Sequence, residues 1–248
     1  MHKNKKIVLG FAALGLALAG GAAFAQALPG VTATPGAGGS VSYSASIETL
    51  VFLTSLTFLP AVLLMCTSFT RIVIVLSLMR QAIGLPSLPP NQVITGLSLF
   101  LTLFVMGPTV DRVIDEAYKP YAAKQIDMSV AIEKAQKPFQ EFMLKQTRQE
   151  DLGVFLNVAK VKVDTPEQVP MRVLVPAFVV SELKTAFLIG FMVFLPFLAI
   201  DLIVSSALMS MGMMMVSPNL ISLPLKLLVF VIANGWGLLV KSLVESFA

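Results

Sequence analysis

Histidine and cysteine are almost absent from this sequence, which contains one of each, His2 and Cys66. A single cysteine excludes an intramolecular disulfide. His2 lies in the first residues, which are expected to be removed as a signal peptide, and its loss also excludes a zinc-type Cys/His cluster, a Cys-His dyad and a Ser-His-Asp triad. The sequence also has no G-x-x-x-x-G-K-[S/T] phosphate-binding loop and no paired-carboxylate spacing. We therefore expect a protein that is not an enzyme and that has no metal site and no cofactor.

Charged residues are scarce as well. They make up only 13% of the 248 residues, whereas 56% are hydrophobic and the mean hydropathy is +0.84. A chain this apolar belongs in a bilayer or inside a large apolar assembly. The formal net charge of +4 includes three lysines among the first six residues and falls to +1 without them. No electrostatic argument for nucleic-acid binding remains.

The first 25 residues have the pattern of a cleavable signal peptide. Lysines precede a short apolar segment that ends at the A-x-A site Ala23-Phe24-Ala25, so we expect cleavage between Ala25 and Gln26. An uncleaved first helix is the alternative, which the basic start and the small residues at the site disfavour. Residues 26–47 are rich in glycine, proline, serine and alanine, and we expect a flexible linker there.

Two apolar segments flank a polar one, and together they predict an all-α fold. Residues 48–108 hold long uncharged stretches around the turn-like GLPSLPPN, which predicts a first helical hairpin. Residues 173–248 are interrupted by prolines, which predicts a second hairpin of two long kinked helices. Residues 109–172 carry ten basic and ten acidic side chains and predict a small helical domain, in which Pro138 should bend or divide a helix.

Among the charged residues of the two apolar segments, five are the first candidates for a functional role: Arg71, Glu182, Lys184, Asp201 and Lys226. A charge at the centre of a membrane helix costs about 2.5–3.5 kcal/mol, so each needs a partner or a wet cavity. Glu182 and Lys184 are two residues apart and face different sides of a helix, so each should pair with another helix or subunit. A proton or ion relay is the functional alternative. The absence of histidine and the matched signs favour ion pairs that fix packing and assembly.

Five methionines surround one glycine in the second apolar segment: Met209, Met211, Met213, Met214 and Met215, around Gly212. Methionine is flexible and polarizable, so it adapts to partners of changing shape, and the glycine adds backbone freedom. Repeated by symmetry, these side chains would form a compliant apolar ring that excludes ions and yields to a passing polypeptide. Loose packing between two helices is the alternative, which composition alone favours.

Two long stretches of the sequence resemble the FliP family of flagellar biosynthesis proteins. LLMCTSFTRIVIVLSLMRQAIG, followed by PPNQVITGLSLFLTLFVMGP, resembles the first half of the family, and the stretch from LVPAFVVSELKTAFLIG to LKLLVFVIANGW resembles the second. The resemblance implies a subunit of the export gate of a type III secretion apparatus. A related virulence secretion system is the alternative to the flagellum, and the signal peptide favours the flagellum.

The resemblance also implies partners and a location. Members of the family form an oligomer, a pentamer, that builds most of a pore wall together with FliQ and FliR. The pore belongs to the flagellar basal body in the bacterial inner membrane, where membrane lipid is a further contact and residues 109–172 would be extracytoplasmic. Larger gate components would supply its cargo, unfolded flagellar proteins.

Several residues acquire roles through this resemblance. The family's methionine gasket falls on Met213, Met214 and Met215, with Met209 and Met211 beside it. Its charged positions in the second half fall on Glu182, Lys184, Asp201 and Lys226, for which we expect a role in assembly. Asn234 departs from the family pattern, because relatives often have an aspartate there.

An ion-coupled multi-pass membrane transporter is the leading alternative function. It would use Asp201, Glu182 and Lys226 as its relay, and it predicts a monomer or simple dimer with pH-dependent uptake. This alternative gives no reason for the clustered methionines.

Overall fold

The computed structural model describes residues 31–35, 41–45, 53–54, 56–57, 64–163, 165–213 and 215–247. The chain divides into two compact units, Met1–Pro60 and Ala61–Ala248. The expected signal peptide and its cleavage position, Ala25 and Gln26, lie outside the described residues, and so does Met214.

The first unit contains a β-hairpin within the segment expected to be a linker. Strands β1 (Val31–Pro35) and β2 (Val41–Ala45) pair antiparallel, with Val31 opposite Ala45 and Pro35 opposite Val41. The strands contain valine, threonine and tyrosine, which favour extended backbone, and the sequence GAGGS separates them. The sequence analysis did not predict this hairpin, because the glycine and proline content of the segment outweighed two short strand patterns.

The second unit is all-α in the residues that the structure describes, as the sequence predicts. Its elements in chain order are α3 (Phe69–Ile83), α4 (Asn91–Val113), the π-helical turn η2 (Ile114–Tyr118), α5 (Lys119–Ala122), α6 (Met128–Gln146), α7 (Gln149–Ala159), the 3-10 turn η3 (Pro166–Gln168), α8 (Met171–Ser210), α9 (Pro218–Ile232) and α10 (Gly235–Glu245).

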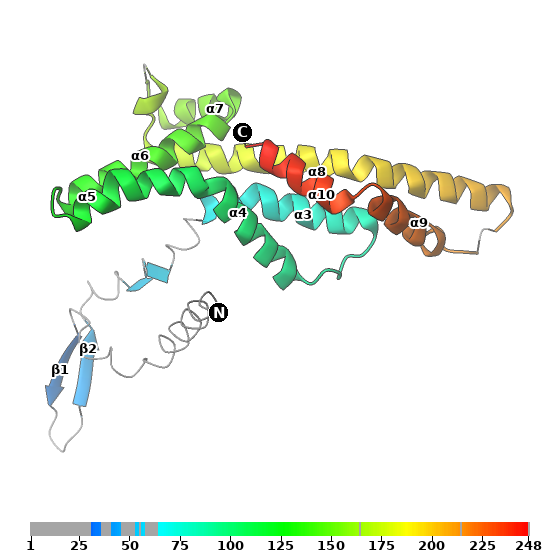
Figure 1. Cartoon of the computed structure of the whole chain (residues 1–248), viewed down its shortest axis with the longest axis horizontal. Helices are drawn as coiled ribbons and strands as arrows, with labels where there is room; N and C mark the ends of the chain where they lie inside the picture. The colour runs from blue at the N-terminus through cyan, green and yellow to red at the C-terminus, as the bar shows by residue number, and fades with distance from the viewer. Residues whose placement is uncertain are drawn as a thin grey trace, which may run out of the picture. The chain divides into compact units, whose positions relative to one another are not determined.

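The long helix α8 organises this unit (Figure 1). Its 40 residues span about 60 Å at the usual rise per residue. Helix α3 packs along α8 more extensively than any other helix does, and α4 packs on α3. Helices α6, α7 and α9 also contact α8, with α6 and α7 toward one end and α9 toward the other. Segments far apart in sequence therefore meet along one helix.

Two apolar clusters form the core. The larger lies among α3, α4, α8, α9 and α10 and includes Ile72, Val75 and Leu76, which are fully buried. Their spacing places them on one face of α3, because residues three and four apart lie above one another on a helix. The smaller cluster includes Met143 of α6 and Phe178 of α8. One cluster fixes the apolar helices and the other fixes the polar helices to α8.

Five prolines lie inside helices of the described residues: Pro108, Pro138, Pro176, Pro196 and Pro224. Helix α6 continues through Pro138, so the division expected there does not occur, and α8 continues through Pro176 and Pro196. The second apolar segment is interrupted between α8 and α9, at the methionines, and again between α9 and α10, whose axes are bent by 64°. Asn234 at this bend has a left-handed backbone with a φ of 50° and is followed by Gly235.

Within the part of the chain that the structure describes, two helical segments are long and apolar enough to cross a membrane. They are Asn91–Ala122, with a mean hydropathy of 1.9, and Met171–Ser210, with a mean hydropathy of 2.6. The bent pair of α9 and α10 qualifies as a third segment if the two helices count as one span. Helix α4 runs across residue 108, where the first apolar segment was expected to end.

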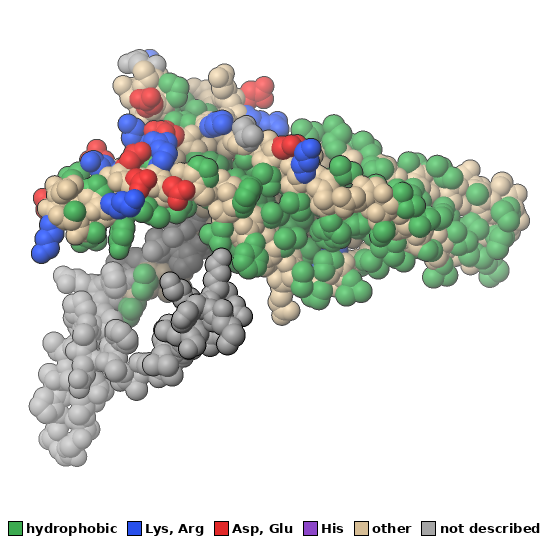
Figure 2. Space-filling view, in the orientation of Figure 1, with side chains coloured by type: hydrophobic (Ala, Val, Ile, Leu, Met, Phe, Trp, Pro, Cys, Tyr) green, Lys and Arg blue, Asp and Glu red, His purple; other side chains and the backbone are tan. Residues whose placement is uncertain are grey.

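Charged and apolar side chains occupy different parts of the surface of the second unit (Figure 2). In this view charged groups gather over α5, α6 and α7, whereas the end formed by α8 and α9 shows many hydrophobic side chains and almost no charged ones. Large side chains such as Phe191 and Met192 of α8 and Val231 of α9 are exposed there. A soluble monomer rarely exposes a continuous apolar surface this large, so lipid or other subunits are expected to cover it.

Candidate functional site: buried charges and an exposed methionine loop

Arg71, in the first turn of α3, forms a buried ion pair with Glu182 of α8. Its Nε donates to Glu182 Oε2 at 2.9 Å, and its Nη2 donates to Oε1 of the same carboxylate. The two side chains are 2% and 0% exposed. A bidentate guanidinium–carboxylate pair is among the strongest hydrogen-bonded contacts in proteins, and this one joins the two most closely packed helices of the fold.

The same guanidinium also binds the C-terminal end of the chain. Arg71 Nη1 donates to the carbonyl oxygen of Ser246 at 2.8 Å and to its Oγ at 3.0 Å. The guanidinium lies 3.8 Å from the centre of the Phe247 ring, within range of a cation–π interaction. Nη2 additionally donates to Gln146 Oε1 at 3.1 Å, and Gln146 Nε2 donates to the Phe247 carbonyl at 3.1 Å. We call Arg71, Glu182, Gln146, Ser246 and Phe247 the Arg71 junction.

A second ion pair joins α9 to α8. Lys226 Nζ donates to Asp201 Oδ2 at 2.6 Å and to the carbonyl oxygen of Ala82, at the end of α3, at 3.3 Å. The Lys226 side chain is buried, and that of Asp201 is partly exposed. The other carboxylate oxygen, Asp201 Oδ1, is buried and has no hydrogen-bond partner among the described residues.

The third ion pair joins α8 to α7. Lys184 Nζ donates to Oδ1 of Asp151, whose side chain is buried, whereas that of Lys184 is about half exposed. Asp151 lies in the first turn of α7, where a carboxylate also interacts favourably with the helix dipole.

The sequence analysis predicted partners on another helix or another subunit, and the structure places all five charges in ion pairs between helices of one chain. Glu182 and Lys184 face different helices, as their spacing predicts. The sequence analysis did not identify Gln146, Asp151, Ser246 or Phe247. Asp151 carries a usable signal in the sequence, since it is an acidic residue in the first turn of a polar helix, where it can pair with a lysine of an apolar helix. Ser246 and Phe247 carry none, because only the fold brings the C-terminus to Arg71.

The methionine loop, defined as Met209–Met215, connects the end of α8 to the segment before α9. Met209, Met211, Met213 and Met215 are 70%, 69%, 41% and 101% exposed, respectively. Gly212 has a φ of 71°, which a residue with a side chain adopts with strain. No charged residue occurs between Asp201 and Lys226 in the sequence. The described methionines of the loop therefore face away from the core of their own chain.

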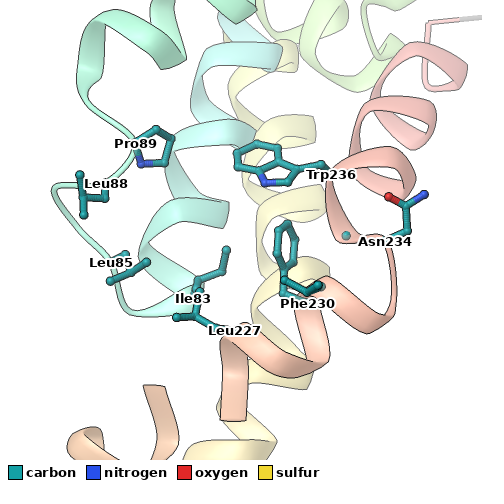
Figure 3. Close-up of a pocket in the computed structure, with 10 residues that line it drawn as sticks. Ile83, Leu85, Leu88, Pro89, Leu227, Phe230, Asn234 and Trp236 are labelled. Carbon is teal, nitrogen blue, oxygen red and sulfur yellow. The ribbon is translucent and has the colours of Figure 1, made fainter. Parts of the chain in front are cut away.

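One hollow, of about 660 Å³, is lined by aromatic side chains such as Phe104 and by the charged side chains of Arg112, Glu141 and Lys145. Another, of about 540 Å³, lies beside the bend between α9 and α10 and is lined by apolar side chains including Ile83, Leu85 and Phe230. Figure 3 shows the rings of Phe230 and Trp236 on one side of it and Leu88 and Pro89 on the other. Among the described residues no group of three or more His, Cys, Asp or Glu side chains is placed to hold a metal ion.

Comparison with known proteins identifies the family. The model of the FliP family matches residues 52–243, which include the apolar helices, the ion-paired charges and the methionine loop. The chain belongs to the FliP family.

Proteins named flagellar biosynthetic protein FliP are close relatives over most of their length. The protein of Pectobacterium carotovorum subsp. carotovorum is 59% identical over 236 residues, 95% of this chain and 91% of that protein. The Aquifex aeolicus protein is 50% identical over 235 residues, 94% of this chain and 97% of that protein. The Bacillus subtilis protein is 51% identical over 205 residues, 82% of this chain and 93% of that protein. The resemblance seen in the two quoted stretches is thus confirmed.

In this member of the FliP family, the match ends before two residues of the Arg71 junction. Ser246 and Phe247 lie beyond residue 243, whereas Arg71, Gln146 and Glu182 lie within the matched region. The junction thus joins the family region to the last residues of the chain.

Proposed function

We propose that the protein is a subunit of the flagellar type III secretion export gate. In this proposal it forms part of the wall of a channel that passes unfolded flagellar proteins, and the methionine loop closes that channel to ions. The observation that carries the proposal is the exposure of four methionines in a segment with no charge. Exposed apolar side chains cost free energy in water, so the loop is expected to meet lipid, cargo or copies of itself.

Assembly into an oligomer accounts for the apolar surface. Phe100, Leu103 and Phe104 of α4 are each exposed by two thirds or more, as are Leu220 and Val231 of α9. We propose that further copies of the chain, a pentamer in the family, cover these surfaces together with FliQ and FliR. Larger gate components would deliver cargo from the cytoplasm. The complex would lie in the inner membrane at the flagellar basal body, with residues 109–172 on the extracytoplasmic side.

The ion pairs have a structural role in this proposal. They neutralise the charges of Arg71, Glu182, Asp201 and Lys226 inside apolar helices. Such a structural role requires no proton transfer. A rigid subunit is what a symmetric channel wall needs, because small differences in helix position would open gaps between copies. The expectation that these charges also bind neighbouring subunits remains a prediction.

An ion-coupled transporter is the second candidate, and one observation favours it. Asp201 Oδ1 is a buried carboxylate oxygen without a partner among the described residues, as expected for a group that binds and releases a cation. Replacement of Asp201 by Asn distinguishes the two functions. If the variant is stable and assembled but shows no pH-dependent uptake, the result supports the ion-coupled transporter. If the variant fails to assemble, the result supports a structural role for Asp201.

Native mass measurement in detergent tests the export-gate proposal. The chain is expected to purify as an oligomer, together with FliQ and FliR when the three are produced in one cell. A chain that purifies only as a monomer with all three present would overturn the proposal.

A further inference from the structure

The hollow of about 660 Å³ lies between α4, α6 and the C-terminal segment, and its inner wall is aromatic. Phe142 is partly buried and Phe247 is 7% exposed, and their rings stack with centroids 6.4 Å apart. Phe104 of α4 also lines the hollow but is 71% exposed, so it borders the opening. The volume falls within the roughly 300–1,000 Å³ of typical ligand sites, and the aromatic wall suits an apolar chain.

The charged lining offers a donor and an acceptor that the fold leaves unused. Arg112 Nη1 donates to Glu141 Oε2 at 2.5 Å, and Arg112 Nε donates to Glu116 Oε1 at 3.1 Å. Glu141 is thus bound by Arg112 rather than by Lys145, which lies four residues later on the same face of α6. Lys145 Nζ and Glu141 Oε1 have no hydrogen-bond partner among the described residues, and both side chains are accessible to solvent.

The charges around the hollow balance. Arg112 and Lys145 are positive and Glu116 and Glu141 are negative, so the group has no net charge at neutral pH. A ligand with a single negative charge would meet two carboxylates, and a ligand with a single positive charge would meet two cations. A ligand that carries one charge of each sign, joined to an apolar chain, matches both the charged and the aromatic lining.

The position of the hollow along α4 indicates what such a ligand is. No charged residue occurs from Gln81 to Val110, whereas Asp111 and Arg112 begin the charged segment. In a helix that crosses a membrane, this change lies at the level of the lipid headgroups. The helical segment Asn91–Ala122, which is long and apolar enough to cross a membrane, contains this change. The aromatic wall therefore lies toward the acyl chains, and the charged lining lies at the headgroups.

We propose that this hollow binds one phospholipid with a zwitterionic headgroup, phosphatidylethanolamine. The phosphate accepts a hydrogen bond from Lys145 Nζ, the ammonium donates to Glu141 Oε1, and an acyl chain packs against Phe104, Phe142 and Phe247. A two-carbon spacer separates the two headgroup charges, which side chains one helical turn apart can both reach. Pockets between transmembrane helices that carry basic side chains bind lipid headgroups in this way. The site goes beyond the proposed function, and a bound lipid leaves room for further copies to cover the rest of α4.

A comparison of three lipids on the unaltered chain tests the headgroup. The full chain is purified in detergent, stripped of lipid and titrated with phosphatidylethanolamine, phosphatidylcholine or phosphatidylglycerol, and native mass spectrometry counts the lipid bound per chain. Phosphatidylcholine has the same charges but no N–H on its amine, and phosphatidylglycerol has no ammonium. We expect one phosphatidylethanolamine per chain, with an affinity about fivefold higher than that of the other two lipids. Equal affinities for all three lipids, or a preference for phosphatidylglycerol, would overturn the proposal.

Matched variants test the place of binding. Lys145→Gln removes the unpaired cation, and its control, Lys134→Gln, removes an exposed lysine of the same helix that does not line the hollow. Phe104→Ser removes part of the apolar lining, and its control is Phe100→Ser, since Phe100 is 74% exposed on the same helix and does not line the hollow. All four side chains are exposed, so these changes should preserve the fold. We expect an affinity about fivefold lower in the first variant of each pair and unchanged in its control, and equal affinities within both pairs would overturn the proposal.

A second copy of the chain is the other occupant that the apolar lining would suit, and native mass distinguishes the two. If the unaltered chain retains no lipid and Phe104→Ser abolishes its oligomer, the hollow is a contact between copies and the lipid proposal is overturned. If the chain binds phosphatidylethanolamine at Lys145 but purifies only as a monomer with FliQ and FliR present, the lipid site stands and the export-gate proposal fails.

Discussion

Replacement of Arg71 by methionine tests the energetic importance of the Arg71 junction. The substitution keeps a long apolar side chain but removes the two hydrogen bonds to Glu182, the two to Ser246 and the one to Gln146. Glu182 is 0% exposed and has no second ion-pair partner among the described residues, so its charge would be left buried and unpaired. The last residues of the chain would lose their anchor at the same time.

The expected destabilisation is large. Breaking a buried ion pair by removing one partner costs about 3–5 kcal/mol, chiefly because the remaining charge is uncompensated. For a chain of this size that corresponds to a melting temperature lower by about 6–20 °C. Replacement of both partners, Arg71→Met with Glu182→Leu, removes the unpaired charge and should cost clearly less than the sum of the two single changes.

Thermal unfolding of the detergent-solubilised protein, monitored by circular dichroism, measures these differences. The two single variants and the double variant form a double-mutant cycle, which isolates the interaction between Arg71 and Glu182. If the free energy of unfolding of Arg71→Met were within about 1 kcal/mol of the parent's, the reasoning would be refuted, since an uncompensated buried charge destabilises a fold by more than that. Additive single changes would also refute it, because they would mean that the two side chains do not interact.

Two further predictions concern other contacts. A Cβ at Gly235 would overlap the ring of Phe230, so Gly235→Ala should lower the free energy of unfolding by about 1–3 kcal/mol. Gly107→Ala is the control, because a Cβ at Gly107 meets no neighbour and should not destabilise the chain. Equal melting temperatures of the two variants would contradict this prediction. A hydrogen bond from Arg112 lowers the pKa of the Glu141 carboxyl, so its stabilisation is present above about pH 4.3 and is lost as the pH falls through the lowered pKa. Glu141→Gln should therefore lower the free energy of unfolding by less than about 1 kcal/mol at pH 7, and should not change it at acidic pH. A difference between variant and parent that grows as the pH falls would contradict the ion pair.

The sequence predicts which charged residues form buried ion pairs better than it predicts their partners. An ionisable residue inside an apolar helix is conspicuous in any sequence, which is why Arg71, Glu182 and Lys226 stand out. Their partners depend on which helix faces come together, and no local pattern records that. The C-terminal residues Ser246 and Phe247 are the clearest case, because they have no local pattern and contact Arg71 only through the fold.

Local breaks in the helices follow packing as much as propensity. Pro138 was expected to bend or divide its helix, and α6 continues through it with Pro138 buried, so the helix is not divided there. The sharp bend falls at Asn234 and Gly235, where Gly235 lets the chain pass close to Phe230. A proline lowers the stability of a helix interior, but tertiary contacts can outweigh that cost.

The central claim, that the methionine loop seals a channel, is tested most directly by passive ion leak in cells. Cells produce the gate with Met213, Met214 and Met215 replaced by alanine, or by leucine as the matched apolar control, and protein level, assembly and flagellar export are followed in parallel. An alanine variant that assembles and leaks ions, beside a leucine variant that assembles and leaks little, is the predicted result. An alanine variant that assembles, exports and stays tight to ions would contradict the claim.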